Sequence, residues 1–364
     1  MIFLLKFVTM NKKVGNILKY TLSILLAAVL LFFAFRDVEW SEFLTALKAC
    51  RWEYVILSML FGLLAFVFRA FRWRMLLLPV DRSTSRLTCF NAINISYLIN
   101  MVLPKVGEVV RCGYITAHSE KVSDENGKTH RLASFDKVLG TAALERTVDV
   151  LMMALLLALF LLFTWKRFGG FFSEKIFGAA SGSLTIGKVV FLVTAIIAVL
   201  AFVWAVVRYS DRWKPFQKAK GFCVGLAQGF VSCLKMDRAW LFFAFTIAIW
   251  GCYWMMSATI LGALQGIDPA SVSSDFASAL TIVNGLNMTD ALFLMLAGSL
   301  SSLVPVPGGF GAFHFIVAGA LSYVYGLPFE FGMIFATLSH ESQAVNQILW
   351  GMVSYISEHF RKQR

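Results

Sequence analysis

The feature that most constrains this chain is an irregular stretch inside an otherwise apolar sequence. Residues 304–314 read VPVPGGFGAFH and lie between the apolar runs Ala291–Leu303 and Phe315–Tyr325. Two prolines and three glycines cannot continue a helix there, because proline lacks an amide hydrogen and glycine is too flexible. In hydrocarbon, an irregular backbone persists only where protein or a water-filled cavity satisfies its amides and carbonyls. We therefore predict a broken or re-entrant segment that lines a site.

A second interruption lies in the first half of the chain. Leu98–Arg111 reads LINMVLPKVGEVVR, and Pro104 and Gly107 interrupt its apolar run. One interrupted segment in each half is typical of membrane proteins that bind a substrate near the middle of the bilayer. The pattern predicts that the two interruptions meet there.

The composition indicates an integral membrane protein. Hydrophobic residues make up 59% of the 364 residues and charged residues only 15%, whereas soluble domains carry about 25% charged residues. The net charge of +12 comes from basic residues beside apolar runs, where they fix topology and meet anionic headgroups. We therefore expect a membrane partner and no nucleic acid, with both termini in the cytoplasm.

The apolar runs predict an all-α polytopic membrane protein with about six full spans and two broken or re-entrant hairpins. The chain would form one integral membrane domain over residues 1–364, and its halves 11–187 and 188–358 would form an inverted repeat, because three crossings per half reverse the second half. An extra crossing at Phe276–Leu286 is the alternative. The basic stretch Arg208–Arg238 would be either a helix on the inner leaflet or a solvated connector. The predicted helical runs are Ile17–Phe35, Tyr54–Phe68, Leu87–Leu103, Val106–Ile115, Val138–Trp165, Val189–Val207, Ala239–Leu264, Phe276–Leu303 with breaks at Asn284–Asp290, Phe315–Tyr325 and Phe331–Ile356.

The run before the first interruption is unusually polar for a membrane segment. Leu87–Leu103 contains Asn91, Asn94 and Asn100. Amide side chains are unfavourable in lipid. We therefore expect this segment to face protein or water.

The first candidate residues surround the earlier interruption. Glu108 and Arg111 are three residues apart and would share a face if a helix resumes after Gly107. Basic groups beside a helix start suit a phosphate, because free amides and the helix dipole add to their charge. We predict that Lys105, Gly107 and Arg111 contact a lipid headgroup and that Glu108 balances charge. The alternative is a Glu–Arg pair that only holds the hairpin together.

Three ionisable residues lie inside the predicted span Val138–Trp165. Asp149 follows Glu145 by one turn, and Arg146 can reach Asp149. Such groups are unfavourable inside a span unless they face a cavity or one another. We predict that Arg146 attracts the headgroup and that Glu145 and Asp149 balance charge or exchange a proton. The alternative is a structural ion triad near the inner surface.

Glycines dominate the later interruption. Gly308, Gly309 and Gly311 permit close approach of the backbone. We predict that they approach a lipid headgroup; the alternative is that they approach another helix or form a turn.

Two histidines and one acid follow these glycines. His314, His340 and Glu341 are predicted to line a lipid or proton path, as groups that balance charge or exchange protons. His340 and Glu341 are adjacent and are expected on different helix faces, so they should not share a metal. A site of two histidines and one carboxylate across helices is conceivable, but nothing in the spacing supports it. We expect no metal and no cofactor.

Three motifs stand in a recognisable order: LPKVGEVVR at 103–111, LERTVDVL at 144–151 and VPVPGGFGAFH at 304–314. Together they resemble the flippase-like membrane domain of bacterial lysylphosphatidylglycerol synthases, over about Asn11–Tyr355. Phe313 and His314 stand where the family often has Arg-Glu, and His340 and Glu341 stand where it often has an arginine. The positions that match are Gly107, Glu108, Arg111, Glu145, Arg146, Asp149, Pro307, Gly308, Gly309 and Gly311.

The resemblance implies that the chain translocates a phosphate-bearing lipid across the bacterial inner membrane. The lipid would be an anionic phospholipid of the phosphatidylglycerol type or a polyprenyl-phosphate-linked lipid. In the full synthases a separate cytosolic domain makes the aminoacylated lipid, and loops of around thirty residues are too short for such a domain. The alternatives are a membrane-embedded glycosyl or acyl transferase, or a non-catalytic membrane partner of a separately encoded lipid-modifying enzyme. Homodimerisation through the glycine-rich spans is open.

Overall fold

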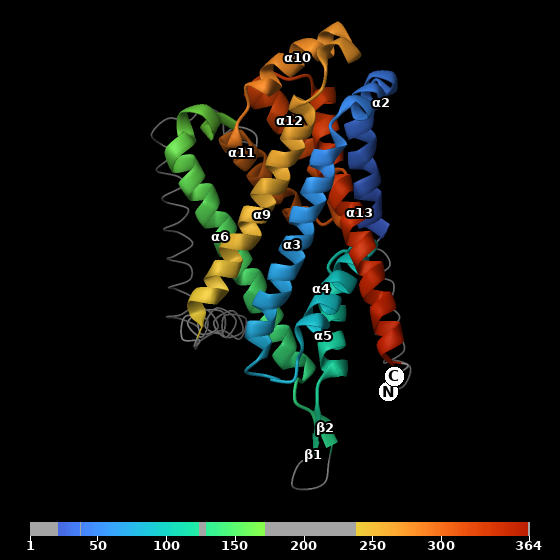
Figure 1. The fold of residues 1–364 in the computed structure, drawn as a ribbon, viewed down its shortest axis with the longest axis vertical. Helices are drawn as coiled ribbons and strands as arrows, with labels where there is room; N and C mark the ends of the chain where they lie inside the picture. Colours follow the sequence, from blue (N-terminus) through green and yellow to red (C-terminus); the bar gives the residue numbers. More distant parts are fainter. Residues whose placement is uncertain (1–20, 37, 124–128, 172–237, 363–364) are drawn as a thin grey trace, which may run out of the picture. The chain divides into compact units, whose positions relative to one another are not determined.

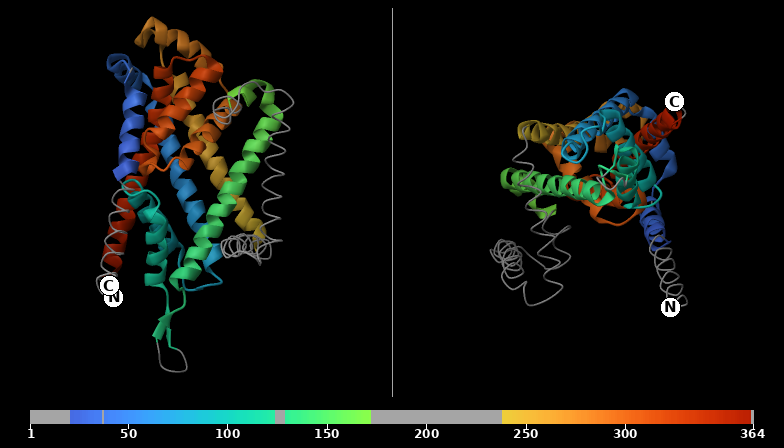
Figure 2. Two further views of the ribbon diagram at one scale, coloured as in Figure 1. Left: turned by 180° about the vertical axis from the view of Figure 1, so that it is seen from behind. Right: turned by 90° about the horizontal axis from the view of Figure 1, so that it is seen from below.

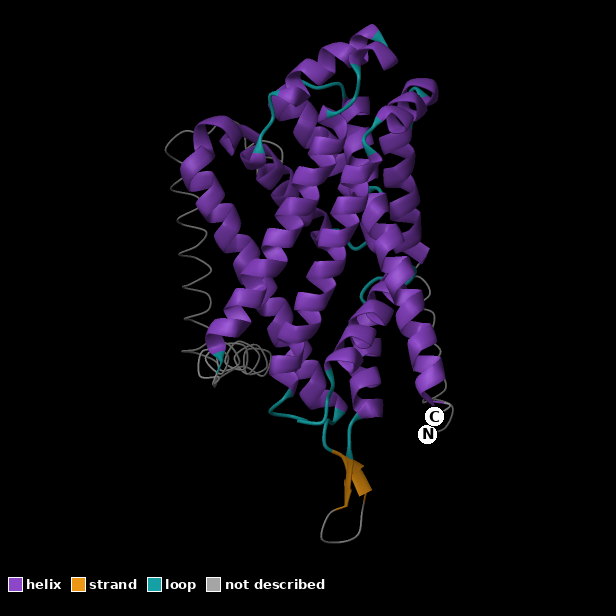
Figure 3. Ribbon diagram, viewed as in Figure 1, coloured by secondary structure: helices purple, strands orange, loops and turns teal. Residues whose placement is uncertain are grey.

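A computed structural model describes residues 21–36, 38–123, 129–171 and 238–362. These residues are helical apart from one antiparallel hairpin, in which β1 (Lys121–Ser123) pairs with β2 (Thr129–Arg131) (Figure 3). The hairpin lies in the polar stretch between two apolar helices. The predicted class, a helical membrane protein, is confirmed.

The chain divides into two compact units, Met1–Ala142 with Ala244–Arg364, and Ala143–Phe243. The predicted division into residues 11–187 and 188–358 stays a prediction. The α-helices are Thr21–Phe35 (unlabelled), α2 (Trp40–Ala49), α3 (Trp52–Leu77), α4 (Arg86–Asn100), α5 (Val106–His118), α6 (Phe135–Gly170), α9 (Ala239–Gln265), α10 (Ser274–Asn284), α11 (Met288–Ser299), α12 (Ala312–Tyr325) and α13 (Phe329–Lys362). Short 3-10 turns are η4 (Pro269–Ser271), η5 (Leu300–Leu303) and η6 (Pro307–Gly309).

Among the described residues, 4 helices are long and apolar enough to cross a membrane, or up to 6 if each of two bent pairs counts as one span. The bent pairs are Thr21–Phe35 with α2, at 88°, and α10 with α11–η5, at 106°. The second bend is fixed by a capping box, in which Asn287 and Asp290 bond each other's backbone at the start of α11. On α3, Leu57, Leu60 and Leu64 are exposed and three or four residues apart, which is the pattern of a face in contact with lipid.

Two pairs of short helices form hairpins around the sequence interruptions. The helices α4 and α5 have 15 and 13 residues, so neither exceeds about 23 Å, less than the roughly 30 Å of a bilayer core. The helices α11 and α12 have 12 and 14 residues and flank the later interruption. Within the first unit, the α4–α5 hairpin lies toward the end that carries β1 and β2, and the α11–α12 hairpin toward the end that carries α10 (Figure 1). The view from behind agrees (Figure 2), so the two hairpins lie at opposite ends of the first unit.

The long helix α13 joins these parts through close packing. A Cβ on Gly351 would lie 2.6 Å from the Leu98 Cβ of α4, and one on Gly62 of α3 would lie 2.3 Å from the Gln343 Oε1. Asn346 also donates to the Met59 carbonyl at 3.0 Å. The absence of side chains at Gly351 and Gly62 thus lets α13 touch both α3 and α4.

Two sequence predictions need correction, and two lie outside the described residues. The second span does not end at Phe68, because α3 continues to Leu77 and carries its arginines inside the protein. The run predicted to end at Trp165 continues to Gly170 in α6. The predictions for Val189–Val207 and Arg208–Arg238 fall outside the described residues.

Candidate functional site

The first interruption is a tight link between α4 and α5. Residues 101–105 are not helical, and Lys105 adopts a left-handed conformation with φ 66° before α5 begins. The side-chain oxygen of Asn100, at the end of α4, accepts a hydrogen bond from the Gly107 amide at 2.8 Å. This bond satisfies one of the free amides at the start of α5. A Cβ on Gly107 would lie 2.1 Å from the Ser96 carbonyl oxygen. Gly107 therefore serves the packing of α5 on α4, whereas its predicted contact with a headgroup stays a prediction.

An ion pair and an aromatic ring hold the basic group of this hairpin. Arg111 is 2% exposed, and its Nη2 lies 2.6 Å from the Glu108 Oε2. The Arg111 guanidinium also lies 4.6 Å from the centroid of the buried Trp73 ring, as a cation–π contact. The predicted shared face of Glu108 and Arg111 is confirmed. Lys105 is exposed at the start of the helix.

The polar residues of α4 face protein, as predicted. Asn91, Asn94 and Ser96 are no more than 2% exposed. Asn94 donates its side-chain amide to the Phe90 carbonyl at 2.9 Å. These side chains are therefore buried in protein and do not face lipid.

Two buried arginines were missed by the sequence analysis. Arg69 donates to the Tyr253 hydroxyl at 3.3 Å, and Arg72, fully buried, donates to the Thr246 hydroxyl at 3.2 Å. Basic residues after an apolar run normally mark the membrane surface, so the sequence pattern does not single them out as buried. The sequence does carry one signal of their burial. Arg69 and Arg72 are three residues apart and therefore share a helix face, Trp73 directly follows Arg72, and the apolar run continues beyond them.

Positive backbone angles shape the second interruption. Gly308, Gly309 and Gly311 have φ values of 58°, 82° and 77°, which residues with a Cβ rarely adopt. A Cβ on Gly311 would also lie 2.6 Å from the Leu30 Cβ. The first described helix, Thr21–Phe35, thus packs directly against this turn. The contacts show a turn and a close approach to another helix at Gly311, whereas the predicted approach of Gly308, Gly309 and Gly311 to a headgroup stays a prediction.

A side chain of the first interruption reaches the second. A Cβ on Gly308 would lie 3.4 Å from the Sδ of Met101, the residue after α4. The Met101 side chain therefore meets the Gly308 turn inside the first unit, whereas a meeting of the two irregular backbones near the middle of the bilayer stays a prediction.

His314, His340 and Glu341 converge beside this meeting point. His314 Nε2 lies 3.3 Å from the Glu341 Oε1, and His340 Nδ1 lies 3.2 Å from the same oxygen. His340 Nε2 lies 2.9 Å from the Gly308 carbonyl oxygen. The expectation that His340 and Glu341 point apart was wrong, because the flexible glutamate side chain brings its carboxylate back over its neighbour.

Aromatic rings enclose this cluster. The His340 ring lies 4.8 Å from that of Phe310, and the His314 ring lies 5.7 Å from that of Phe35, centroid to centroid. The two imidazoles are 5.1 Å apart. His314 is buried, whereas the Glu341 side chain is 40% exposed, so the cluster opens on the side of the carboxylate.

Glu145, Arg146 and Asp149 all lie on α6 within the second unit. Glu145 is fully buried, and Arg146 and Asp149 are half-buried. Their meeting with the hairpins of the first unit stays a prediction.

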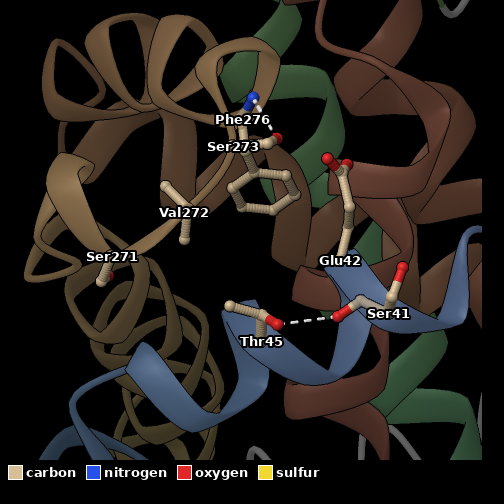
Figure 4. A pocket seen from close by; sticks show the side chains of 7 residues that line it. All are labelled: Ser41, Glu42, Thr45, Ser271, Val272, Ser273 and Phe276. Carbon is tan, nitrogen blue, oxygen red and sulfur yellow. Dashed lines mark hydrogen bonds between the residues drawn. The ribbon is translucent and has the colours of Figure 1, made fainter.

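A separate pocket of ≈ 210 Å³ lies between α2 and the segment from η4 to α10 (Figure 4). Thr45 donates to the Ser41 carbonyl at 2.8 Å on one wall, and Ser273 caps α10 on the other. Glu42 is its one charged lining residue. The pocket contains none of the predicted site residues.

Comparison with known proteins identifies the family. The family model of the lysylphosphatidylglycerol synthase transmembrane region matches residues 20–351. The chain belongs to this family. Both interruptions, the α6 triad and the histidine cluster all lie within the region matched to the lysylphosphatidylglycerol synthase family. Neither the curated proteins nor the solved structures that were searched contain a match.

Proposed function

We propose that this protein binds a phosphate-bearing lipid at the meeting point of its two hairpins and translocates it across the bacterial inner membrane, with both termini in the cytoplasm. The lipid would be of the phosphatidylglycerol type or linked to a polyprenyl phosphate. One observation carries the proposal: the Met101 side chain, from the first irregular segment, reaches Gly308 in the second, inside an apolar helical unit. Such segments are tolerated at membrane depth where they are buried in protein or line a polar path.

The charges near the hairpins suit an anionic headgroup. Arg111 on α5 and Arg69 and Arg72 on α3 present guanidinium groups at 5% exposure or less. Arginine recognises phosphate through two parallel hydrogen bonds, which are stronger where water is excluded. In this proposal Arg111 exchanges part of its contact with Glu108 for the phosphate, and Glu108 keeps the site balanced when empty. The acyl chains stay in the surrounding lipid.

The test is lipid translocation by the purified chain in vesicles. Fluorescent phosphatidylglycerol and a labelled polyprenyl phosphate are placed in the vesicles, and the label that becomes accessible to an external quencher is followed over time. A labelled zwitterionic lipid serves as the specificity control. We expect translocation of the anionic lipids well above that in empty vesicles.

A matched pair of variants locates the activity. Arg111→Gln removes the buried guanidinium and should slow translocation about tenfold or more, which corresponds to about 1.4 kcal/mol or more. Arg51 pairs with Glu53 at 2.6 Å, the same distance as between Arg111 and Glu108, but Arg51 is 48% exposed. Arg51→Gln should therefore leave the rate unchanged. Rates equal to those of empty vesicles for every anionic lipid would refute the proposal. Product formation from a lipid acceptor and an activated donor would instead favour the transferase alternative.

A further inference from the structure

The His314–His340–Glu341 cluster has an electrostatic arrangement that calls for a cation. His340 Nε2 faces the Gly308 carbonyl oxygen at 2.9 Å. A carbonyl can only accept, so Nε2 carries the proton. In a neutral imidazole the other nitrogen then carries a lone pair. That nitrogen, Nδ1, lies 3.2 Å from the Glu341 Oε1. Two electron-rich atoms therefore face each other across the cluster.

His314 adds a second nitrogen donor from another helix. Its side chain is 1% exposed, and its Nε2 lies 3.3 Å from the same Glu341 oxygen. Neither of its ring nitrogens makes a hydrogen bond of regular geometry to another described residue. One ligand atom from each of the three residues lies within 4.8 Å of the other two. A buried imidazole is thus directed at the same point as His340 and Glu341.

Two of the three ligand separations match the edges of a metal coordination sphere. Ligand atoms around tetrahedral zinc, at bond lengths of about 2.0–2.1 Å, lie about 3.3 Å from one another. The two histidine-to-carboxylate separations here are 3.2 and 3.3 Å. Histidines that bind metals usually donate their second ring nitrogen to a carbonyl or carboxylate, which is what His340 does with Gly308.

We propose that His314 Nε2, His340 Nδ1 and the Glu341 carboxylate bind one divalent transition-metal ion, for which Zn²⁺ is the best match. Two imidazoles and one carboxylate suit zinc and its neighbours, whereas Mg²⁺ and Ca²⁺ prefer oxygen ligands throughout. The fourth position faces the exposed side of Glu341 and takes water or another small oxygen ligand. The ion ties α12 and α13 to the Gly308 turn. The site does not rest on lipid translocation and can be tested without it.

The first experiment measures zinc binding by the full chain in detergent. The protein is stripped with a chelator, which is then removed, and Zn²⁺ is titrated against a competing fluorescent chelator while bound metal is counted by mass spectrometry. We expect one Zn²⁺ per chain. His314→Gln, His340→Gln and Glu341→Gln should each weaken binding at least tenfold. Retention of wild-type affinity in the double variant His314→Gln/His340→Gln would overturn the assignment.

The control comes from a similar pair elsewhere in the first unit. His118 Nδ1 lies 2.8 Å from the Tyr114 carbonyl oxygen, and its Nε2 contacts Glu358. Among the described residues this pair has no second histidine near enough to complete a metal site. His118→Gln should therefore bind zinc like the wild type, and an equal loss in this variant would overturn the assignment.

A second measurement uses the unmodified chain, in case a buried histidine variant does not fold. X-ray absorption of the zinc-loaded protein should show two imidazole ligands and oxygen, with bonds of about 2.0–2.1 Å. Loading should also raise the unfolding temperature, because a ligand that binds the native state stabilises it. Sulfur ligands in the spectrum, or no bound zinc at all, would overturn the proposal and leave a protonated His340 as the cation.

Discussion

The contact between Gly107 and α4 gives a quantitative test of the first hairpin. In Gly107→Ala the new Cβ would lie 2.1 Å from the Ser96 carbonyl oxygen, and ordinary van der Waals contact begins at 3.4 Å. The helices α4 and α5 must therefore separate by about 1.3 Å. That movement also breaks the 2.8 Å hydrogen bond from the Gly107 amide to Asn100.

The expected magnitude follows from these two losses. Overpacking costs about 1–3 kcal/mol, and the lost hydrogen bond costs about 1 kcal/mol. The better helix propensity of alanine returns up to about 1 kcal/mol. We expect Gly107→Ala to lower the free energy of unfolding by about 1–3 kcal/mol.

Gly113 is the matched control on the same helix. A Cβ there would meet nothing within 4 Å, so Gly113→Ala should gain about 0.5–1 kcal/mol. Both variants are purified in one detergent, and thermal unfolding is followed by tryptophan fluorescence. The two midpoints should differ by roughly 5–10 °C, with Gly107→Ala the lower. If Gly107→Ala unfolds at or above the temperature of Gly113→Ala, the close approach of α4 and α5 is refuted.

Two further predictions concern buried charge. Glu108→Gln removes the partner of the nearly fully buried Arg111 and should destabilise the protein by about 2 kcal/mol. Glu53→Gln is the control, because its pair with Arg51 is exposed. In the same unfolding assay it should change stability by less than about 0.5 kcal/mol. Burial alone would raise the pKa of Asp81, but hydrogen bonds from Ser119 and Ser83 hold the pKa of that carboxyl below its ordinary value. Because its folded pKa is lowered, Asp81 stabilises the protein above the unfolded pKa of about 3.9, and this is lost as the pH falls through the folded pKa. Asp81→Asn should therefore unfold about 2 kcal/mol more easily at pH 7, and the gap should narrow as the pH falls from about 4 through the folded pKa; a gap that does not narrow below pH 4 would contradict this.

Local sequence rules were sufficient where the physical constraint was local. The burial of Asn91 and Asn94 followed from the unfavourable placement of amides in lipid. The pairing of Glu108 with Arg111 followed from helix periodicity, because residues three apart share a face. The two interruptions followed from proline and glycine, which stop a helix wherever they cluster.

Long-range partners could not be read from local patterns. Arg69 bonds to Tyr253 and Arg72 to Thr246, pairs separated by 184 and 174 residues. An arginine at the end of an apolar run looks the same whether it reaches the cytoplasm or a hydroxyl on another helix. The convergence of His314 with His340 depends on how the Gly308 turn seats α12 against α13, which residue spacing does not encode.

The two hairpins differ in chemistry but share one helix. The α4–α5 hairpin supplies a guanidinium and an acid, and the α11–α12 hairpin supplies an imidazole that meets the imidazole and acid of α13. Gly351 places α13 against α4, and Gly332 places it against α12, where a Cβ would lie 2.7 Å from the Ala318 Cα. Both close contacts lie on α13, so this helix packs against both hairpins. In the proposed function, a lipid that moved the hairpins apart would act against the packing at Gly351 or at Gly332, and this would couple the proposed headgroup site to the histidine cluster through a single helix.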